Sequence, residues 1–498
     1  MKVAFWQSGF ESLGLEYLSS SLKKIGYSPK LFFEPALFDD REVNNPYLAP
    51  IFDTKNKLIR DIIDYSPDIL AFSSLTDNFS HDLLIANTIK KALPKNKIIF
   101  GGVHATSVPE YVLSHPSIDH VCIGEGEEAF IEFVKAVEEG KSTEKIRNIW
   151  SKDDSGNIIK TPLRPLISDI DNIPFPDKEL FYKKAPYFKD TYNIISSRGC
   201  ILNCNYCVNS TYHRLYKNDV RFRRRSIKNI LSELIYAEKT WEPVSFAFKD
   251  DMFLTDKEWI LSFFSEYEKH ISTPFCCMVH PGYLDEEIIS SMKNAGCVSI
   301  SIGVQNMSQV ILKRFNRKQS GSIIINNCRL LRKYKIPFTI GHICGMSNNA
   351  EKESIDSFRI YSRLKPMRVN FYFLTYYPGT ELTRKALKDG ILTKEKYSER
   401  ISGHSTSYFE TGDISIKEYQ RLKSIAQMIP FLPYKIMDIV IKKKLYKILP
   451  KSYVFSGFLQ DLVNIYCVLS GKEPKNLPIL KKYLIEIPRI LYRKIGHK

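Results

Sequence analysis

The stretch "SSRGCILNCNYCVNS", residues 196–210, holds Cys200, Cys204 and Cys207 in the spacing C-x3-C-x2-C. Thiolates bind metals well, so three of them on one short loop indicate a metal or cluster site. One alternative is zinc with His213, the nearest histidine, as fourth ligand, although zinc usually takes paired Cys units. Another is three structural thiols. The third is a cubane iron–sulfur cluster, in which three thiolates hold three irons and leave the fourth open.

A regular alternation of strands and helices surrounds this motif. The predicted strands of residues 186–395 are short apolar runs, and the motif directly follows the first of them. They span residues 192–197, 244–251, 275–280, 297–305, 338–345 and 369–377. Six strands separated by helices predict a (β/α)6 barrel or partial barrel, in which functional residues lie at the carboxyl ends of the strands.

A second α/β pattern occupies residues 1–140. Apolar strands such as "DILAFSSLT" and "KIIFGGVHA" alternate with helices, which predicts a doubly wound, Rossmann-like parallel sheet. Ligands bind such sheets at the carboxyl ends of the strands, where this sequence has small or polar residues. These residues are Ser73, Ser74, Thr76, Gly101, Gly102, Gly124, Glu125 and Gly126. The alternative is that they only begin the helices that follow.

Two further segments complete the expected organisation. Residues 141–185 are rich in Pro and Asp and lack clear periodicity, which predicts a linker. Residues 396–498 have a helical pattern interrupted by prolines. No run of about 18 uncharged apolar residues predicts a membrane span, and the N-terminus lacks the apolar core of a signal peptide. A cytoplasmic protein with reduced thiols is therefore expected.

The cysteine motif carries an aromatic residue, Tyr206, immediately before its last cysteine. In this it resembles the radical S-adenosylmethionine (SAM) superfamily, whose signature is C-x3-C-x-aromatic-C after the first barrel strand. The resemblance implies that Cys200, Cys204 and Cys207 bind a [4Fe-4S] cluster whose open iron binds SAM. In that family, an electron from the cluster cleaves SAM to a 5′-deoxyadenosyl radical.

Other barrel segments occupy positions that contact SAM in that superfamily. The resemblance implies that "FAFKDDMF" supplies Asp250 and Asp251 to the amino group of SAM. Similarly, "SIGVQN" would supply Gln305 to the ribose hydroxyls, and "GHICGMSNN" would place Gly345 near the adenine. The alternative for each polar residue is an ordinary exposed strand end.

The N-terminal segment resembles the cobalamin-binding domain of the cobalamin-dependent radical SAM proteins, and the resemblance extends to about residue 390. It implies that the strand-end residues of the first sheet line the corrinoid and its nucleotide tail. Classical cobalamin carriers have a D-x-H-x-x-G loop after the first strand, but this loop reads "QSGFESLG", residues 7–14. We therefore expect cobalt without a histidine ligand; His81 and His104 lie near other loops. A domain that binds nothing is the alternative.

The resemblance implies an enzyme that transfers a methyl group from methylcobalamin to an unactivated carbon, as a class B methyltransferase does. Relatives such as anaerobic magnesium-protoporphyrin ester cyclase form rings instead, and the sequence does not separate these reactions or assign a catalytic residue. The expected partners are a small-molecule or lipid-like substrate and an electron donor such as flavodoxin or ferredoxin. A non-catalytic, corrinoid-binding regulator is an alternative. A nucleic-acid role rests only on "RFRRRSIK", residues 221–228, which no RNA-binding domain accompanies.

The positive charge of the chain is concentrated near its end. The formal net charge is +17, and residues 434–498 hold 14 Lys and Arg against 4 Asp and Glu. Two stretches there, residues 434–449 and 477–498, are basic and amphipathic. Such helices lie on an anionic membrane surface or cover the barrel and expose their lysines to water. The first alternative would place the protein at the periphery of the membrane.

Overall fold

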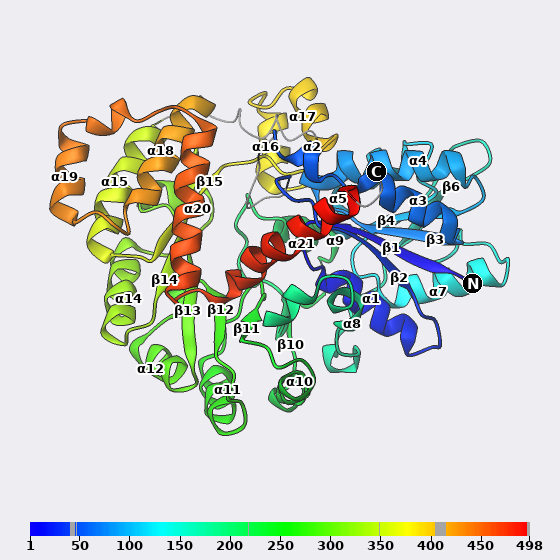
Figure 1. The fold of residues 1–498 in the computed structure, drawn as a ribbon, viewed down its shortest axis with the longest axis horizontal. Helices are drawn as coiled ribbons and strands as arrows, with labels where there is room; N and C mark the ends of the chain where they lie inside the picture. The colour runs from blue at the N-terminus through cyan, green and yellow to red at the C-terminus, as the bar shows by residue number, and fades with distance from the viewer. Residues whose placement is uncertain (40–44, 46, 218, 348, 404–414, 496–498) are drawn as a thin grey trace.

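The computed structural model describes residues 1–39, 45, 47–217, 219–347, 349–403 and 415–495. Two β-sheets lie side by side, each covered by helices, and a helical C-terminal region runs beside both (Figure 1). The sheets have seven and six strands. This arrangement confirms the expected α/β class and the expected order of its parts.

The N-terminal sheet has the strand order β2-β1-β3-β4-β5-β6-β7. Its strand β1 (Val3–Ser8) is buried along its whole length, and Phe5 and Trp6 belong to apolar clusters on opposite faces of the sheet. Helices cover both faces, as in a doubly wound domain. The other elements are β2 (Lys30–Glu34), β3 (Ile69–Ser73), β4 (Lys97–Gly101), β5 (His120–Cys122), α1 (Leu13–Lys23), α2 (Ala49–Phe52), α3 (Lys55–Tyr65), η1 (Thr76–Asn78), α4 (Phe79–Ala92), α5 (Gly102–Ser107), α6 (Pro109–Leu113) and α7 (Glu127–Glu138).

The segment 141–185 is more than the expected linker. It contributes the antiparallel strands β6 (Ile149–Lys152) and β7 (Ile158–Ile159) to the edge of the N-terminal sheet. The Asp153 carboxylate accepts hydrogen bonds from the Ser155 and Asn157 backbone N–H groups, which closes the turn between β6 and β7. This polar turn explains why the sequence predicts a loop here. The elements that follow are η2 (Ile170–Asn172), α8 (Glu179–Tyr182) and η3 (Pro186–Asp190).

The second sheet is an open, all-parallel barrel with the order β15-β14-β13-β12-β11-β8. Each expected barrel strand is present, and the edge strands β8 and β15 do not pair, so the barrel is partial, as predicted. Its strands are β8 (Thr191–Ile194), β11 (Ser245–Phe248), β12 (Phe275–Val279), β13 (Cys297–Gln305), β14 (Phe338–Cys344) and β15 (Arg368–Phe373). Its helices are α9 (Asn209–Leu215), α10 (Ile227–Trp241), α11 (Lys257–His270), η4 (Pro281–Tyr283), α12 (Glu286–Asn294), α13 (Gln309–Arg314), α14 (Gly321–Lys333), α15 (Ala350–Leu364) and α16 (Glu381–Lys388). The short strands β9 (Ser197–Gly199) and β10 (Phe222–Arg224) form a separate pair.

The C-terminal region is helical, as expected, and connects both domains. Its elements are α17 (Lys394–Ile401), α18 (Ile416–Met428), α19 (Tyr434–Lys442), η6 (Leu445–Ile448), α20 (Tyr453–Leu469), η7 (Pro474–Asn476) and α21 (Leu477–Ile495). Helix α18 packs on β15, and η7 packs against β8 and β11, so the region reaches both open edges of the barrel. Helix α21 runs from there to the N-terminal domain (Figure 1).

A membrane-crossing helix is not evident in the described part of the chain. No single helix there is long and apolar enough, and only α20 together with Pro474–Tyr492, bent by 120°, meets the length and composition of a span.

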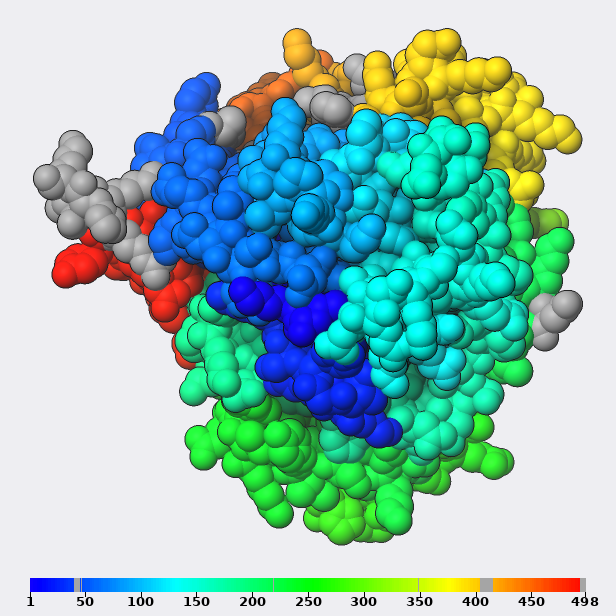
Figure 2. Space-filling view, turned by 90° about the vertical axis from the view of Figure 1, so that its right-hand side faces the viewer, coloured from blue at the N-terminus to red at the C-terminus, as the bar shows by residue number. Residues whose placement is uncertain are grey.

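Buried ion pairs join the two domains. Arg198, just before the cysteine motif, pairs with Glu125 and Glu127 at 3.1 and 2.5 Å, and Arg223 pairs with Glu125 at 2.8 Å. Figure 2 shows the N-terminal domain, in blue to cyan, lying directly on the green barrel. The carboxyl end of β5 is therefore held against the cysteine loop.

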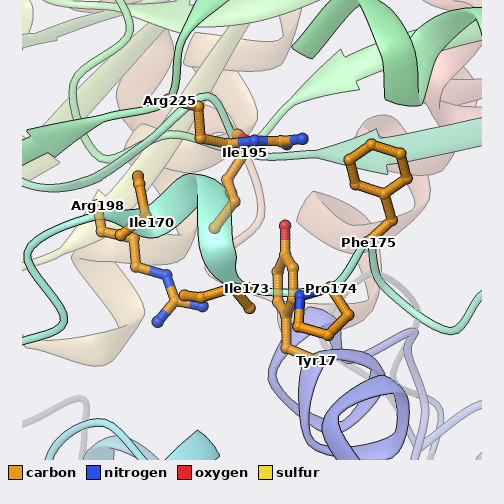
Figure 3. A pocket seen from close by; sticks show the side chains of 8 residues that line it. All are labelled: Tyr17, Ile170, Ile173, Pro174, Phe175, Ile195, Arg198 and Arg225. Carbon is orange, nitrogen blue, oxygen red and sulfur yellow. The ribbon is translucent and has the colours of Figure 1, made fainter. Parts of the chain in front are cut away.

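A small crevice of about 10 Å³ lies beside this joint. Tyr17 enters it from α1, and Arg198 and Arg225 line its other side (Figure 3). The Tyr17 ring lies 5.2 Å from the Arg198 guanidinium. Because the crevice can hold no more than about one water molecule, it is part of the joint and not a ligand site.

Candidate functional site

The cysteine loop begins where β8 ends and is shaped by a glycine. Gly199 has φ +84°, and a Cβ there would lie 2.1 Å from the Arg221 carbonyl oxygen, so only glycine fits. Cys200 and Cys204 are buried, and Cys207 is half-buried. All three are free thiols, and their sulfurs are turned into one cavity.

Each sulfur of the motif receives one N–H donor. The Leu202 backbone N–H lies 3.4 Å from Cys200 Sγ, Arg317 Nη1 lies 3.7 Å from Cys204 Sγ, and Asn209 Nδ2 lies 3.7 Å from Cys207 Sγ. Such donors stabilise thiolates and tune the potential of a cluster that they hold. The environment therefore suits three thiolate ligands.

The zinc alternative loses its fourth ligand in this arrangement. His213 Nε2 lies 2.8 Å from the Cys200 carbonyl oxygen, and Nδ1 lies 3.4 Å from Asn203 Oδ1. Both ring nitrogens thus support the loop. Within the described residues, no three His, Cys, Asp or Glu side chains are grouped closely enough to hold one metal ion. Sulfurs that are set apart fit a cubane, because each thiolate there binds a different iron.

The cavity beside the cysteines runs down the inside of the barrel and has a volume of about 440 Å³. Its cluster end is lined by Tyr206, Asn209, Asp251, Gln305 and Arg317. Its deeper part is lined by Lys249, Cys276, Met278, Ser301, Arg368, Lys475 and Asn476, whereas Asn370 and Tyr372 line it at the levels of Gly303 and Gln305. This volume lies within the range of small-molecule sites.

The two adjacent aspartates have different environments. Asp251 lines the cavity, and burial raises its pKa, which a hydrogen bond from the Asn209 side chain opposes. Asp250 is buried and turned away from the cavity: its carboxylate accepts hydrogen bonds from the Ser196 backbone and from the Ser196 and Ser197 hydroxyls. Asp251 therefore stays the predicted contact for the SAM amino group, whereas Asp250 braces the loop before the cysteines.

The predicted ribose and adenine contacts also differ. Gln305 ends β13 with φ +65° and lines the cavity. Gly345 is buried just after β14, while Gly303 and Gly341 line the cavity wall instead. A Cβ at Gly303 would lie 2.9 Å from Arg317 and 3.0 Å from Gln305, so this glycine keeps space for both side chains. These glycines lie within strands, where sequence patterns gave no signal.

Several strand-end residues of the N-terminal sheet are already engaged within the domain. The Ser74 hydroxyl donates to Asp82 at 2.8 Å, and Thr76 Oγ1 lies 3.2 Å from His104 Nδ1. Ser73, in contrast, is only half-buried at the end of β3. His81 pairs with Glu34 at 2.8 Å, and His104 is completely buried against Phe79, so neither histidine considered from the sequence is exposed at the edge of the sheet.

Glu125 lies at a strand end and also takes part in the ion pairs that join the two domains. Burial would raise its pKa, but the hydrogen bond from Arg223 and the charges of Arg198 and Arg223 lower it. It also accepts a hydrogen bond from the Ile167 backbone. Its carboxylate is thus fully occupied by protein groups.

The four predicted glycines form the least obstructed part of this edge. Gly101 is half-exposed, and Gly102 has φ +87°, where a Cβ would lie 2.9 Å from the Ser74 carbonyl oxygen. Gly124 has φ +78°, and a Cβ there would clash with Tyr216 of the barrel; Gly126 precedes α7. Tyr216 thus covers Gly124, and the half-buried backbone at Gly101, Gly102 and Gly126 is where a flat macrocycle such as a corrin would approach closely.

The arginine-rich segment at residues 221–228, which suggested nucleic-acid binding, contacts other parts of the same chain. Arg223 pairs with Glu125, Arg224 stacks on Trp259 at 4.2 Å, and Arg225 pairs with Glu233 at 2.6 Å. Three of its arginines therefore form contacts between elements, while Arg221 and Lys228 are exposed.

Comparison with known families accounts for both halves of the site. Residues 8–134 match the B12 binding domain, and residues 194–358 match the Radical SAM superfamily. The chain is a cobalamin-dependent radical SAM protein. Its cofactors are accordingly a [4Fe-4S] cluster, SAM and cobalamin, and the residues described above fit each of them.

Curated relatives of this radical SAM protein include methyltransferases and cyclases. An uncharacterized methyltransferase, PH0819, of Pyrococcus horikoshii is 24% identical over 68% of this chain and 73% of its own length. The cytidylyl-2-hydroxyethylphosphonate methyltransferase of Streptomyces wedmorensis is 23% identical over 78% of this chain and 80% of its own. The anaerobic magnesium-protoporphyrin IX monomethyl ester cyclase of Cereibacter sphaeroides is 25% identical over 78% and 64%.

Solved structures show the same fold. The cobalamin-dependent SAM radical enzyme OxsB matches with a TM-score of 0.68 at 15% identity, over 100% of this chain and 81% of its own. The radical SAM methyltransferase TsrM of Kitasatospora setae matches with a TM-score of 0.62 at 14% identity, over 79% and 77%. The two-domain arrangement with a C-terminal region is therefore shared, including residues beyond the family matches.

Proposed function

We propose that this radical SAM protein is a C-methyltransferase that acts on an unactivated carbon of a small molecule. The observation that carries the proposal is the joint at Arg198, which lies two residues before Cys200 and pairs with Glu125 and Glu127 of the B12-binding domain. The cluster loop and the B12-binding edge are thereby held side by side. A methyl donor and a radical source need such proximity to act on one substrate atom.

When bound, the cofactors supply a 5′-deoxyadenosyl radical and a transferable methyl group. The chain positions them and keeps water away. The Leu202, Arg317 and Asn209 N–H groups would fix the sulfurs, and Asp251 and Gln305 would orient SAM. The N-terminal domain closes the barrel mouth, since the Gly124 backbone packs on Tyr216.

The test is an anaerobic reaction of the reconstituted protein with SAM deuterated at its methyl group, using lipids, porphyrins and natural-product scaffolds as substrates. A product that gains a labelled methyl group supports methyl transfer. A product that loses two hydrogens without label supports the second candidate, a radical cyclase, which the cyclase relatives favour. Flavodoxin or ferredoxin would supply the electrons. Hydroxocobalamin that binds with a base-on spectrum would contradict the expected lack of a histidine ligand.

We further propose that the protein is cytoplasmic and binds the membrane surface through its C-terminal region. One side of α20 exposes Val454, Phe458, Leu462 and Leu469, with exposed fractions from 47% to 75%. The preceding segment exposes Lys435, Lys442, Lys443, Lys444, Lys447 and Lys451. Apolar side chains beside lysines suit an anionic bilayer, to which each well-placed Lys adds about 1 kcal/mol. Such contact would favour a lipid-like substrate.

Sedimentation with anionic and neutral vesicles tests this contact. A Val454→Ser/Phe458→Ser/Leu462→Ser variant should lose binding to anionic vesicles, and high salt should weaken binding of the wild type. The control replaces three exposed apolar residues elsewhere, Leu84, Val310 and Ile391. Equal sedimentation of both variants would leave the C-terminal region as a cover of the barrel only.

A further inference from the structure

The deep part of the barrel cavity is strongly cationic. Among its described lining residues, Lys249, Arg317, Arg368 and Lys475 are cationic, and Asp251 is the single carboxylate. Arg317 is engaged at the cluster end, where it donates to the Gly303 carbonyl and to Cys204 Sγ. The other three cations lie deeper, so their charge is not explained by the cluster.

Arg368 and Lys475 share one counterion that the C-terminal region brings in. Glu473 is buried; its carboxylate lies 3.1 Å from Arg368 Nη2 and 3.1 Å from Lys475 Nζ. Asn476 donates to the other oxygen of Glu473 at 3.0 Å. One carboxylate thus serves two cations, which leaves one positive charge uncompensated.

Lys475 points across the barrel. Its Nζ donates to Ser301 Oγ at 2.8 Å, and Ser301 lies two residues before Gly303 on β13. Since a strand rises about 3.3 Å per residue, Lys475 reaches a level roughly 6–7 Å below the one where Arg317 meets Gly303 and Cys204. The C-terminal region, outside the radical SAM match, therefore contributes directly to the cavity wall.

Lys249 has no partner for its ammonium group. It follows β11 and is exposed to the cavity, yet within the described residues it makes no ion pair and its side chain donates no hydrogen bond. Burial and nearby Lys475 lower its pKa, against the opposing effects of Cys276 and Glu11. Glu11 itself is held by Lys178 at 2.8 Å and by Asn193 at 2.5 Å, so it does not neutralise Lys249.

We propose that Lys249 and Lys475, with the amide of Asn476, bind a carboxylate or phosphate group of the substrate. Lys249 lines the cavity without a counterion, and an anion between the two lysines would be attracted by both ammonium groups. SAM has one carboxylate, which the resemblance assigns to the open iron, so an anion at this deeper level belongs to the substrate. The proposal rests on the proposed function in treating the cavity as the substrate site.

The test measures inorganic phosphate binding to the cluster-reconstituted full-length protein by calorimetry, in parallel with SAM binding by equilibrium dialysis. Lys249→Met and Lys475→Met should each weaken phosphate binding at least about tenfold and leave SAM affinity within about twofold. Lys472→Met is the matched control: this half-buried lysine three residues before Lys475 donates to Tyr466 Oη, so the variant should bind phosphate as the wild type does. Iron content and Tm show that each variant folds, and Lys249→Arg and Lys475→Arg should restore binding.

Two results would overturn the proposal. Equal phosphate affinity in the wild type and both Met variants would show that the lysines bind no anion. A loss of SAM affinity in Lys249→Met that matches its loss of phosphate affinity would show that this group holds the carboxylate of SAM. Phosphate binding needs neither cobalamin nor turnover, so absence of methyl transfer would contradict the proposed function while leaving this subsite tested independently.

Discussion

The two sheets of this protein both end in polar and small residues, but they use those residues differently. At the carboxyl ends of the barrel strands, Asp251 and Gln305 face an open cavity. At the corresponding ends of the N-terminal sheet, Ser74 is bonded to Asp82, and Glu125 is bonded to Arg198 and Arg223. The polar groups at the barrel edge are available to ligands. At the N-terminal edge, most polar groups are bonded within the domain or to the barrel, and the remaining positions are glycines.

The largest expected effect is at the cysteine motif. Replacing Cys200, Cys204 and Cys207 with Ala should abolish the cluster, because no other described thiols are arranged around the cavity mouth in this way. Iron analysis and the charge-transfer absorption of the reconstituted protein measure this. The Cys467→Ala control, a buried thiol in the C-terminal region, should keep its iron. Iron retained by the triple variant would exclude these ligands.

The barrel edge was largely predictable from the sequence. Its strands are buried apolar runs bounded by turns, and the cysteine spacing is specific. The sequence did not show that Asp250 turns inward to Ser196 and Ser197, because neighbouring aspartates look alike until the loop is folded. Nor could it place Lys475, since that contact joins β13 to a segment 174 positions away. Local patterns predict elements, and such distant contacts depend on packing.

The second prediction concerns the joint. Glu125→Gln removes the charge that two buried arginines share, and breaking a buried pair in this way costs about 3–5 kcal/mol. We expect a lower Tm and faster proteolysis between the domains. Glu128→Gln, an exposed neighbour on α7, is the control and should behave as the wild type does. An unchanged Tm in Glu125→Gln would show that the N-terminal edge is free for ligands after all.

The third prediction uses pH to test whether buried Asp82, which accepts the Ser74 hydrogen bond, is protonated in the folded protein. Burial raises the pKa of Asp82 to about 7, although hydrogen bonds from Ser74 and Trp6 and the charge of His81 oppose the rise. Between the unfolded value of 3.8 and about 7, the folded protein keeps a proton that the unfolded chain releases. Stability therefore falls as pH rises through this range and levels off above it.

Asp82→Asn should remove that decline. Between pH 5 and 7 the variant should gain about 2 kcal/mol relative to the wild type, at about 1.36 kcal/mol per pH unit until the slope falls near the folded pKa. Tm measured across this range gives the comparison, and His81 titrates in both proteins, so its effect largely cancels. Parallel Tm curves for the two proteins would mean that burial does not raise the pKa of Asp82.

The smallest expected effect separates the two aspartates of the barrel. Asp251→Asn removes a charge that faces the cavity, so SAM affinity should fall about tenfold or more, as expected for a charge-assisted hydrogen bond worth about 1.5–3 kcal/mol. Its Tm should stay near that of the wild type.

Asp250→Asn removes an acceptor for the hydrogen bonds that Ser196 and Ser197 donate inside the protein, so its Tm should fall. Its SAM affinity should fall only to the extent that the loop before the cysteines loses its structure. Equilibrium dialysis and calorimetry of the cluster-reconstituted variants distinguish the two patterns. If Asp250→Asn lost SAM affinity with an unchanged Tm, the buried aspartate would be the ligand, and the barrel edge would resemble the N-terminal edge in hiding its functional groups.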